Sequence, residues 1–236
     1  MKPAGRPETL WGTLRQSAPQ VGHVVRHMRP TWRFRTLASV TPAFLSRHGI
    51  EGVIWDVDGT LTAYHHHQLD PSVEPTLRAL VALPNVRHAI VSNSPEGRFA
   101  ALGTLFPTMR VVRVYNADGV LHPRTLFHGE DSMTPEARAA LDNAGAYALR
   151  KPSRQLLEHA LAVLECRASQ AVMIGDQYLT DIAGAGMAGV RSIKVEPIVP
   201  TSFPLSLRAA QLAERVLFAV RYGRSSLSDP SFPEKP

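Results

Sequence analysis

The segment GVIWDVDGTL, residues 52–61, passes from an apolar run directly into two aspartates, Asp56 and Asp58, which Gly59 and Thr60 follow. A short continuous apolar run is typical of a strand buried on both faces of a parallel sheet. In open parallel sheets, ligands bind just beyond the carboxyl ends of the strands. The segment therefore predicts a buried strand that delivers two carboxylates to a binding site.

The same alternation of apolar runs and helix-period segments continues along the chain. The expected strands are Val53–Asp56, His88–Ser92, Arg110–Tyr115, Ala171–Gly175 and Val190–Val195. The expected helices are Pro71–Leu83, Pro95–Leu105, Pro135–Asn143, Ser153–Leu164 and Leu179–Met187. Strands that alternate with helices predict an α/β fold with a doubly wound, Rossmann-like parallel sheet.

Polar side chains follow several of these strands and helices at the predicted ligand-binding edge. They are Asp56 and Asp58, Ser92 and Asn93 in IVSNS, Lys151 in LRKPS, and Asp176 and Asp181 in MIGDQYLTDI. Neighbouring carboxylates in a low-dielectric pocket repel one another unless a cation compensates their charge. Oxygen ligands favour Mg²⁺, which commonly binds one or two carboxylates together with a substrate phosphate. The pattern predicts a metal and phosphate site.

In this order and with these flanks, the motifs resemble the haloacid dehalogenase (HAD) superfamily. DVDGT resembles its first motif, the serine of VSNS its second, Lys151 its third and GDQYLTD its fourth. The flanks are similar to those of subfamily IIIA, the YqeG family, which is itself similar to mitochondrial phosphatidylglycerophosphate phosphatases. The resemblance covers about residues 36–222 and implies a HAD core.

The resemblance implies roles for the two aspartates of the first motif and for the fourth. Asp56 would be the nucleophile that forms an aspartyl-phosphate, and Asp58 would be the general acid and base. Mg²⁺ would be held by Asp56, by the backbone carbonyl of Asp58 and by Asp176. Asp181 would orient Lys151 or a metal-bound water.

The remaining motif residues are implied to hold the transferring phosphoryl group. Gly59 lets the chain turn beside the phosphate, and the Thr60 hydroxyl holds that turn. Ser92 would bind a phosphoryl oxygen, together with the backbone N–H groups that follow it, beginning with that of Asn93. Lys151 would neutralise the charge that develops during transfer.

Each piece also has a simpler explanation when it is taken alone. Asp-Gly pairs are common turns, Ser92-Asn93 alone suits a helix cap, and Lys151 alone suits a surface charge. GAGMAG, residues 184–189, fits a dinucleotide-binding pattern but follows a helix, which predicts a close-packed helix end instead. Adjacent histidines such as His65–His67 lack the spacing of helical metal ligands, so substrate contact is favoured there. The joint occurrence of all four motifs favours the phosphate and metal site.

Spacing bears on access to the site and on domain organisation. Only 34 residues separate Asp58 from Ser92, so no large cap domain fits between them. A longer insert, about residues 116–147, could form a lid that carries Arg124 and His128. We therefore expect a basic N-terminal arm (1–35), a HAD phosphatase domain (36–225) and a flexible tail (226–236).

The positive charge is concentrated at the N-terminus. Residues 1–50 hold eight lysines and arginines against one acid, although the whole chain has a net charge of only +6. Such an arm is either solvated or binds anionic lipid or nucleic-acid phosphates. Near the C-terminus, Leu205, Leu212, Val216 and Ala219 share one helical face, which either packs on the domain, as we favour, or lies on a membrane.

Composition suggests where the protein acts. The single cysteine, Cys166, cannot form an internal disulfide, and no secretory signal or apolar run of membrane-spanning length is evident. We expect a cytoplasmic protein with possible peripheral contact at the inner face of an anionic membrane.

The favoured function is a Mg²⁺-dependent phosphomonoester hydrolase that uses an aspartyl-phosphate. The substrate is a phosphorylated small molecule or a phospholipid, with phosphatidylglycerophosphate, converted to phosphatidylglycerol, implied by the resemblance. One alternative is a phosphatase for a soluble sugar phosphate or nucleotide. Another is a nucleic-acid-binding or assembly protein on a HAD scaffold, although nucleic acid is the less favoured partner. The sequence defines no oligomeric state.

Overall fold

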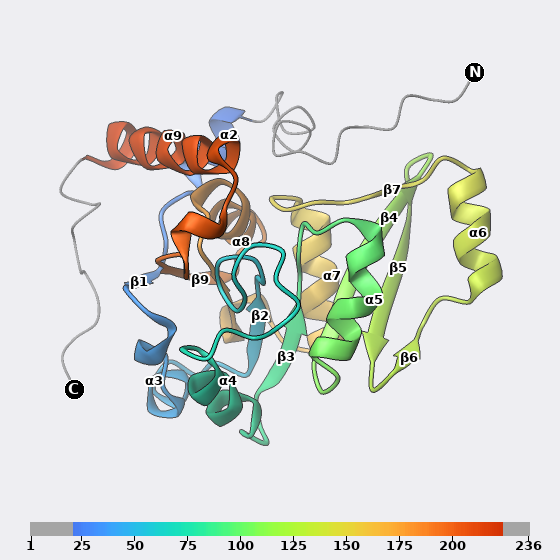
Figure 1. The fold of residues 1–236 in the computed structure, drawn as a ribbon, viewed down its shortest axis with the longest axis horizontal. Coiled ribbons are helices and arrows are strands. Elements are labelled where there is room, and N and C mark those ends of the chain that lie inside the picture. Colours follow the sequence, from blue (N-terminus) through green and yellow to red (C-terminus); the bar gives the residue numbers. More distant parts are fainter. Residues whose placement is uncertain (1–20, 224–236) are drawn as a thin grey trace.

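A single mixed sheet organises residues 21–223, the part of the chain that the computed structural model describes (Figure 1). The strands lie in the order β1-β9-β8-β2-β3-β4-β5-β6, and β7 pairs with β4. Their bounds are β1 (Trp32–Phe34), β2 (Gly52–Trp55), β3 (Arg87–Ile90), β4 (Arg110–Ala117), β5 (Val120–Phe127), β6 (Glu130–Asp131), β7 (Tyr147–Ala148), β8 (Ala171–Gly175) and β9 (Arg191–Val195). The helices are α2 (Val21–Arg26), α3 (Pro42–Arg47), α4 (Glu74–Val81), α5 (Glu96–Leu105), α6 (Pro135–Asn143), α7 (Arg154–Leu164), α8 (Ala183–Met187) and α9 (Leu205–Tyr222).

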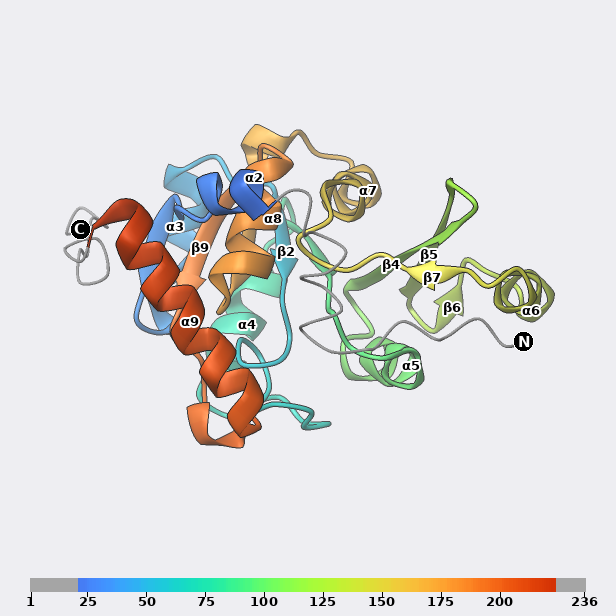
Figure 2. The same cartoon turned by 90° about the horizontal axis from the view of Figure 1, so that it is seen from above.

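From β1 to β4 every neighbouring pair of strands is parallel, whereas β5, β6 and β7 pair antiparallel. The central strands β2 and β8 are buried along their whole lengths, which explains their unbroken apolar sequences. Helices cover both faces of the sheet (Figure 2). One face packs against α3, α4 and α5 through residues such as Leu45, Leu80 and Phe99, and the other packs against α7 and α8. The predicted α/β class with a mostly parallel, doubly wound sheet is confirmed.

The predicted elements agree with the structure within a few residues, with two differences. Pro135–Asn143 matches α6, where Thr134 accepts a hydrogen bond from the Ala137 amide and caps the helix. The predicted helix Leu179–Met187 is instead a π-helical turn, Tyr178–Ile182, that leads into α8. The predicted strands do not include β1, β5, β6 or β7, and the predicted helices do not include α2 or α3.

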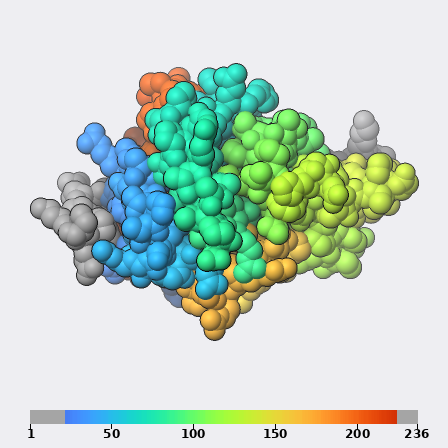
Figure 3. Space-filling model, turned by 90° about the horizontal axis from the view of Figure 1, so that it is seen from below, coloured from blue at the N-terminus to red at the C-terminus, as the bar shows by residue number. Residues whose placement is uncertain are grey.

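The insert at about residues 116–147 continues the sheet and does not form a lid. Strand β5 pairs with β4 over seven residue pairs, from Val111↔Leu126 to Ala117↔Val120. The guanidinium of Arg124 pairs with Glu96 and Asp131 and so does not face the predicted site. His128 lies in the turn between β5 and β6 with φ of 51°. Figure 3 shows this part of the chain, coloured yellow-green, at one end of the molecule.

Part of the expected N-terminal arm lies inside the fold. Within residues 21–35, α2 packs near α8, and β1 forms the edge of the sheet beside β9, with Phe34 buried in the core. The Arg33 guanidinium lies 3.0 Å from the Glu196 carboxylate. The expected boundary at residue 35 therefore separates β1 from the sheet to which it belongs. Residues 1–20 and the expected tail, 226–236, lie outside the described residues.

Helix α9 packs through a different face from the one we favoured. Glu214 and Phe218 are its buried residues, whereas Leu205, Leu212 and Val216 are exposed. The expectation that the latter face packs on the domain is wrong. Within residues 21–223, no helix combines the length and the apolar character that crossing a bilayer requires.

Candidate active site

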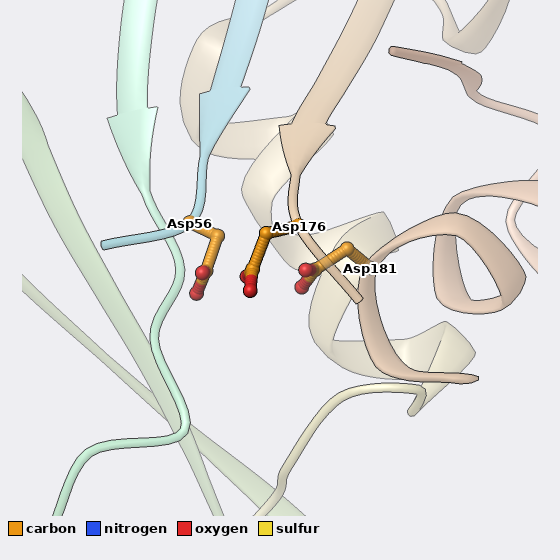
Figure 4. Close-up of side chains that lie close together, drawn as sticks. All are labelled: Asp56, Asp176 and Asp181. Carbon is orange, nitrogen blue, oxygen red and sulfur yellow. The ribbon is translucent and has the colours of Figure 1, made fainter. Parts of the chain in front are cut away.

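Three aspartates converge where the central strands end. Asp56 follows β2 and Asp176 follows β8, and these strands are parallel neighbours in which Trp55 pairs with Ile174. The Asp56 amide extends this pairing by donating to the Ile174 carbonyl at 2.9 Å. Asp181, on the π-helical turn, faces the same space, and each of the three aspartates offers one carboxylate oxygen within 4.8 Å of the others (Figure 4). In the sheet, β3 is the neighbour of β2 on one side and β8 is its neighbour on the other. The site at the end of β2 therefore lies at the switch point of the sheet.

Lys151 joins this acidic group from a distant part of the sequence. Its Nζ lies 2.5 Å from Asp56 Oδ1 and 2.7 Å from Asp181 Oδ1, and the whole residue is only 1% exposed. The predicted association of Lys151 with the first and fourth motifs is therefore present in the structure. Its ion pair with Asp181 also fits the orienting role that we expected for Asp181.

The electrostatics of the site favour further positive charge. Burial raises the pKa of Asp56 to about 7, although the Lys151 charge opposes the shift. Burial, together with the charges of Asp56 and Asp181, raises the pKa of Asp176 well above its ordinary value. The pKa of Lys151 is raised despite its burial, because Asp181 and Asp56 stabilise the ammonium. One lysine thus faces more carboxylate charge than it can neutralise.

The donor set fits a divalent cation. Asp176 Oδ1 is buried and has no hydrogen-bond donor among the described residues. Buried polar atoms in folded proteins almost always have a partner, and an orphaned carboxylate oxygen beside two other carboxylates suits a hard cation such as Mg²⁺. The carboxylates of Asp56 and Asp176 would hold such an ion. The carboxylate of Asp58 lies outside the group, which is consistent with our expectation that only its backbone carbonyl reaches the metal.

Two glycines leave room for the aspartates. Gly59 has φ of +88°, and a Cβ there would lie 2.7 Å from both Asp176 Oδ2 and Phe203 Cζ. A Cβ on Gly175 would overlap the Asp181 side chain. Thr60, which we expected to hold the turn, directs its hydroxyl toward Asp56 Oδ2 at 3.4 Å. The predicted turn after the first motif is thus closely packed against the fourth.

Arg98 holds the carboxylate of Asp58. Its Nη1 donates to both oxygens of Asp58, at 2.5 and 2.6 Å, and its Nη2 donates to the His66 carbonyl at 2.8 Å. The His65 amide donates a further bond to Asp58 Oδ1 at 2.7 Å. Nothing in the sequence marked Arg98, because a single arginine in a helix is usually a solvated side chain.

The predicted phosphate-binding pair, Ser92 and Asn93, follows β3 and lies beside the aspartates. Ser92 Oγ accepts a bond from the Ser94 amide at 3.2 Å and lines the cavity. The Asn93 side chain is occupied otherwise: its Oδ1 accepts from the Lys151 amide at 2.7 Å and its Nδ2 donates to the Lys151 carbonyl. Asn93 therefore positions the loop that carries Lys151, and only its backbone remains for the predicted phosphate contact.

Helix α9 contributes a second set of supports that the sequence did not reveal. Glu214 is buried and accepts bonds from the amides of Tyr178 and Leu179, so its carboxylate caps the π-helical turn. Gln211 Nε2 approaches Asp176 Oδ2 at 3.4 Å. Both residues link α9 to the fourth motif.

Asp56, Asp58 and Lys151 line a cavity of about 420 Å³. Its other polar lining residues include Ser92, Arg150 and Gln177. Its apolar lining residues include Phe203, Pro204 and Leu207. The cavity therefore combines charged and polar side chains with an apolar part.

The two patterns that we set aside also have clear positions. In GAGMAG, a Cβ on Gly186 would clash with the His27 carbonyl oxygen at 2.9 Å and one on Gly184 would lie a tight 3.2 Å from Pro152 Cα, as expected for a close-packed helix. His65 stacks on Tyr64 and lines the cavity, whereas His66 and His67 line a separate hollow beside α5, so substrate contact at these histidines stays a prediction. Among the described residues, the metal-compatible group contains aspartates only.

Comparisons with known proteins agree with this geometry. A family model described as HAD-hydrolase-like matches residues 148–197, the segment that contains Lys151, Asp176 and Asp181. The chain is 22% identical over 187 residues to "Probable phosphatase YqeG" of Bacillus subtilis. The aligned residues are 79% of this chain and 88% of that protein. The predicted resemblance to HAD phosphatases is confirmed.

Two further relatives carry the name phosphatidylglycerophosphate phosphatase 1. The chloroplastic protein of Chlamydomonas reinhardtii is 25% identical over 177 residues, which are 72% of this chain and 53% of that protein. The chloroplastic/mitochondrial protein of Arabidopsis thaliana is 26% identical over 73% of this chain and 42% of that protein. The chain thus spans about half the length of these two relatives.

Proposed function

We propose that the protein is a Mg²⁺-dependent phosphomonoester hydrolase that acts through an aspartyl-phosphate on Asp56. The observation that carries the proposal is the position of the Asp56 carboxylate, which follows β2, pairs with Lys151 at 2.5 Å and lies beside Asp176. A bound divalent ion would supply positive charge to the carboxylates and to the phosphate oxygens.

In the first step, a carboxylate oxygen of Asp56 forms a bond to phosphorus while the bond from phosphorus to the ester oxygen breaks. Asp58 supplies a proton to the leaving alkoxide. In the second step, Asp58 takes a proton from water, whose oxygen attacks phosphorus and releases inorganic phosphate and the Asp56 carboxylate. Arg98 fixes the position from which Asp58 acts, while Lys151 and Ser92 support the phosphoryl oxygens.

The substrate that we favour is a phospholipid monoester, with phosphatidylglycerophosphate as the first candidate. The names of the relatives support this choice, and so do the apolar residues Phe203, Pro204 and Leu207 in the lining of the cavity, which suit the apolar part of a lipid. The proposal places the protein in the cytoplasm, where it would meet its substrate at the inner face of the membrane.

The test is phosphate release from phosphatidylglycerophosphate in mixed micelles, compared with a sugar phosphate and a nucleotide at equal concentration. We expect the lipid to be hydrolysed with the highest kcat/KM, and we expect EDTA or Asp56→Asn to abolish release from every ester. Equal or better hydrolysis of a soluble ester would assign the alternative substrate class. An active Asp56→Asn protein would contradict the proposed chemistry.

A further inference from the structure

Helix α9 carries an apolar stripe on its outward face. Leu205, Leu212, Val216 and Val220 are 78%, 63%, 56% and 80% exposed. These residues are spaced by seven, four and four positions, which places them on one side of the helix. The exposed Ala209 and Ala213 lie between them. The stripe therefore runs along nearly the whole helix, and none of the described residues buries it.

The opposite face anchors the helix. Glu214 binds the amides of Tyr178 and Leu179, and the Phe218 ring stacks on Tyr178 with a centroid distance of 4.3 Å. At the C-terminal end, the Tyr222 hydroxyl donates to the Arg26 carbonyl at 2.8 Å. These contacts fix the helix on the domain, so the stripe faces away from the domain.

The exposed charges of α9 itself are positive. They belong to Arg208, Arg215 and Arg221, while its single acid, Glu214, is buried. From outside the helix, the Glu196 carboxylate lies 3.9 Å from Arg215, so two of the three arginines have no acid of α9 or Glu196 beside them. Helix α2, which carries the exposed Arg26, contacts the C-terminal end of α9 through the Tyr222 hydroxyl. An apolar stripe with flanking arginines suits insertion at an anionic lipid surface. A second copy of the chain would instead bring like charges together across a twofold interface.

Helix α9 also borders the cavity, through a different face from the stripe. Ser206, Leu207 and Ala210, from the first turns of the helix, line the cavity that contains Asp56 and Lys151. At about 3.6 residues per turn these positions are rotated from the stripe by roughly 90–180°. We propose that α9 docks on an anionic phospholipid bilayer through this stripe, which would bring the protein, and with it the cavity, to the membrane surface. The inference rests on the proposed phosphatase function only in its consequence, that the enzyme would meet a membrane-bound phosphate ester at that surface.

The test is flotation of the full chain with vesicles of phosphatidylcholine alone or with added phosphatidylglycerol. We expect binding to the anionic vesicles that falls as salt is raised, and a loss of at least about tenfold in Leu212→Gln/Val216→Gln because two exposed apolar side chains no longer enter the lipid. Val120→Gln/Leu121→Gln is the matched control: these residues are also exposed, but they lie in the β4–β5 hairpin, and we expect no loss.

Hydrolysis of a soluble ester separates this inference from the proposed function. Both double variants should hydrolyse it at the native rate, which also shows that they fold. Absence of binding to anionic vesicles, or binding that Leu212→Gln/Val216→Gln leaves unchanged, would overturn the docking proposal. So would a dimer that this variant dissociates, since the stripe would then belong to a second copy. A protein that binds vesicles but hydrolyses no ester would contradict the proposed function alone.

Discussion

Replacing Lys151 with methionine removes the cation that bridges Asp56 and Asp181 while nearly preserving the volume of the side chain. The lysine is 1% exposed and its Nζ lies 2.5 and 2.7 Å from the two carboxylates. Removing one partner from a buried ion pair leaves charge without compensation and costs about 3–5 kcal/mol. We therefore expect a large loss of stability at neutral pH in the absence of metal.

Protonation of a carboxylate limits this loss. The pKa of Asp56 is about 7 even with Lys151 in place, so this group is already partly protonated at pH 7 and adds little further loss when the lysine is removed. The loss therefore comes mainly from the Asp181 carboxylate, which the lysine contacts at 2.7 Å. The loss falls with pH, because below the unfolded pKa a carboxyl group is protonated in both states. We expect Lys151→Met to lower the free energy of unfolding by about 3 kcal/mol at pH 7 and by much less at pH 4.

Urea denaturation of the two proteins in EDTA at both pH values measures the difference. Lys151→Met/Asp181→Asn is the partner control, and we expect it to recover part of the loss at pH 7 because one uncompensated carboxylate is gone. Added Mg²⁺ should also stabilise the single variant, since the ion supplies positive charge. A loss below about 1 kcal/mol at pH 7, or an equal loss at both pH values, would refute the view that Lys151 compensates buried carboxylates.

Three further predictions follow from the site and the core. Asp58→Asn should lower kcat for alkyl phosphates by about 10²–10⁴ but much less for p-nitrophenyl phosphate, whose leaving group needs no proton; an equal loss on both would contradict the acid role. Gly59→Ala should lower the free energy of unfolding by about 1–3 kcal/mol in thermal or urea denaturation, because φ is +88°. It should also weaken Mg²⁺ binding, because the new Cβ would meet Asp176. Native Mg²⁺ affinity in this variant would contradict the reasoning. Burial lowers the pKa of His88 to about 4, so the free energy of unfolding should fall by about 3 kcal/mol between pH 6.5 and pH 4. This part of the pH dependence should be missing in His88→Gln. An NMR titration of His88 with a midpoint near 6.5 would contradict the prediction.

Much of the site could be predicted because its residues follow strands with unmistakable sequences. Continuous apolar runs place Asp56, Ser92 and Asp176 at one edge of a parallel sheet. Helix α6 could be predicted to the residue because Thr134 and Pro135 mark its start. Local sequence was sufficient wherever a cap or an apolar run determined the element.

The parts that could not be predicted depend on contacts between distant residues. Arg98 meets Asp58 across 40 positions, and no local pattern distinguishes it from a surface arginine. Strand β1 is only three residues long and lies among arginines, so the pattern there indicates a basic arm. For α9, apolar spacing correctly indicates a helix, but the face that packs carries Leu217 and Phe218 together with the buried Glu214, which caps the Tyr178 turn. Because two faces of this helix carry apolar residues, the spacing alone does not identify the one that packs.

The most direct test of the account is to trap the covalent intermediate on Asp56. Borohydride added during turnover reduces an aspartyl-phosphate to homoserine, and mass spectrometry of the peptide containing residues 52–61 locates the change. We predict homoserine at position 56 when substrate and Mg²⁺ are both present, and none when either is omitted. Steady turnover with unmodified Asp56, or reduction at another aspartate, would contradict the assignment of the nucleophile.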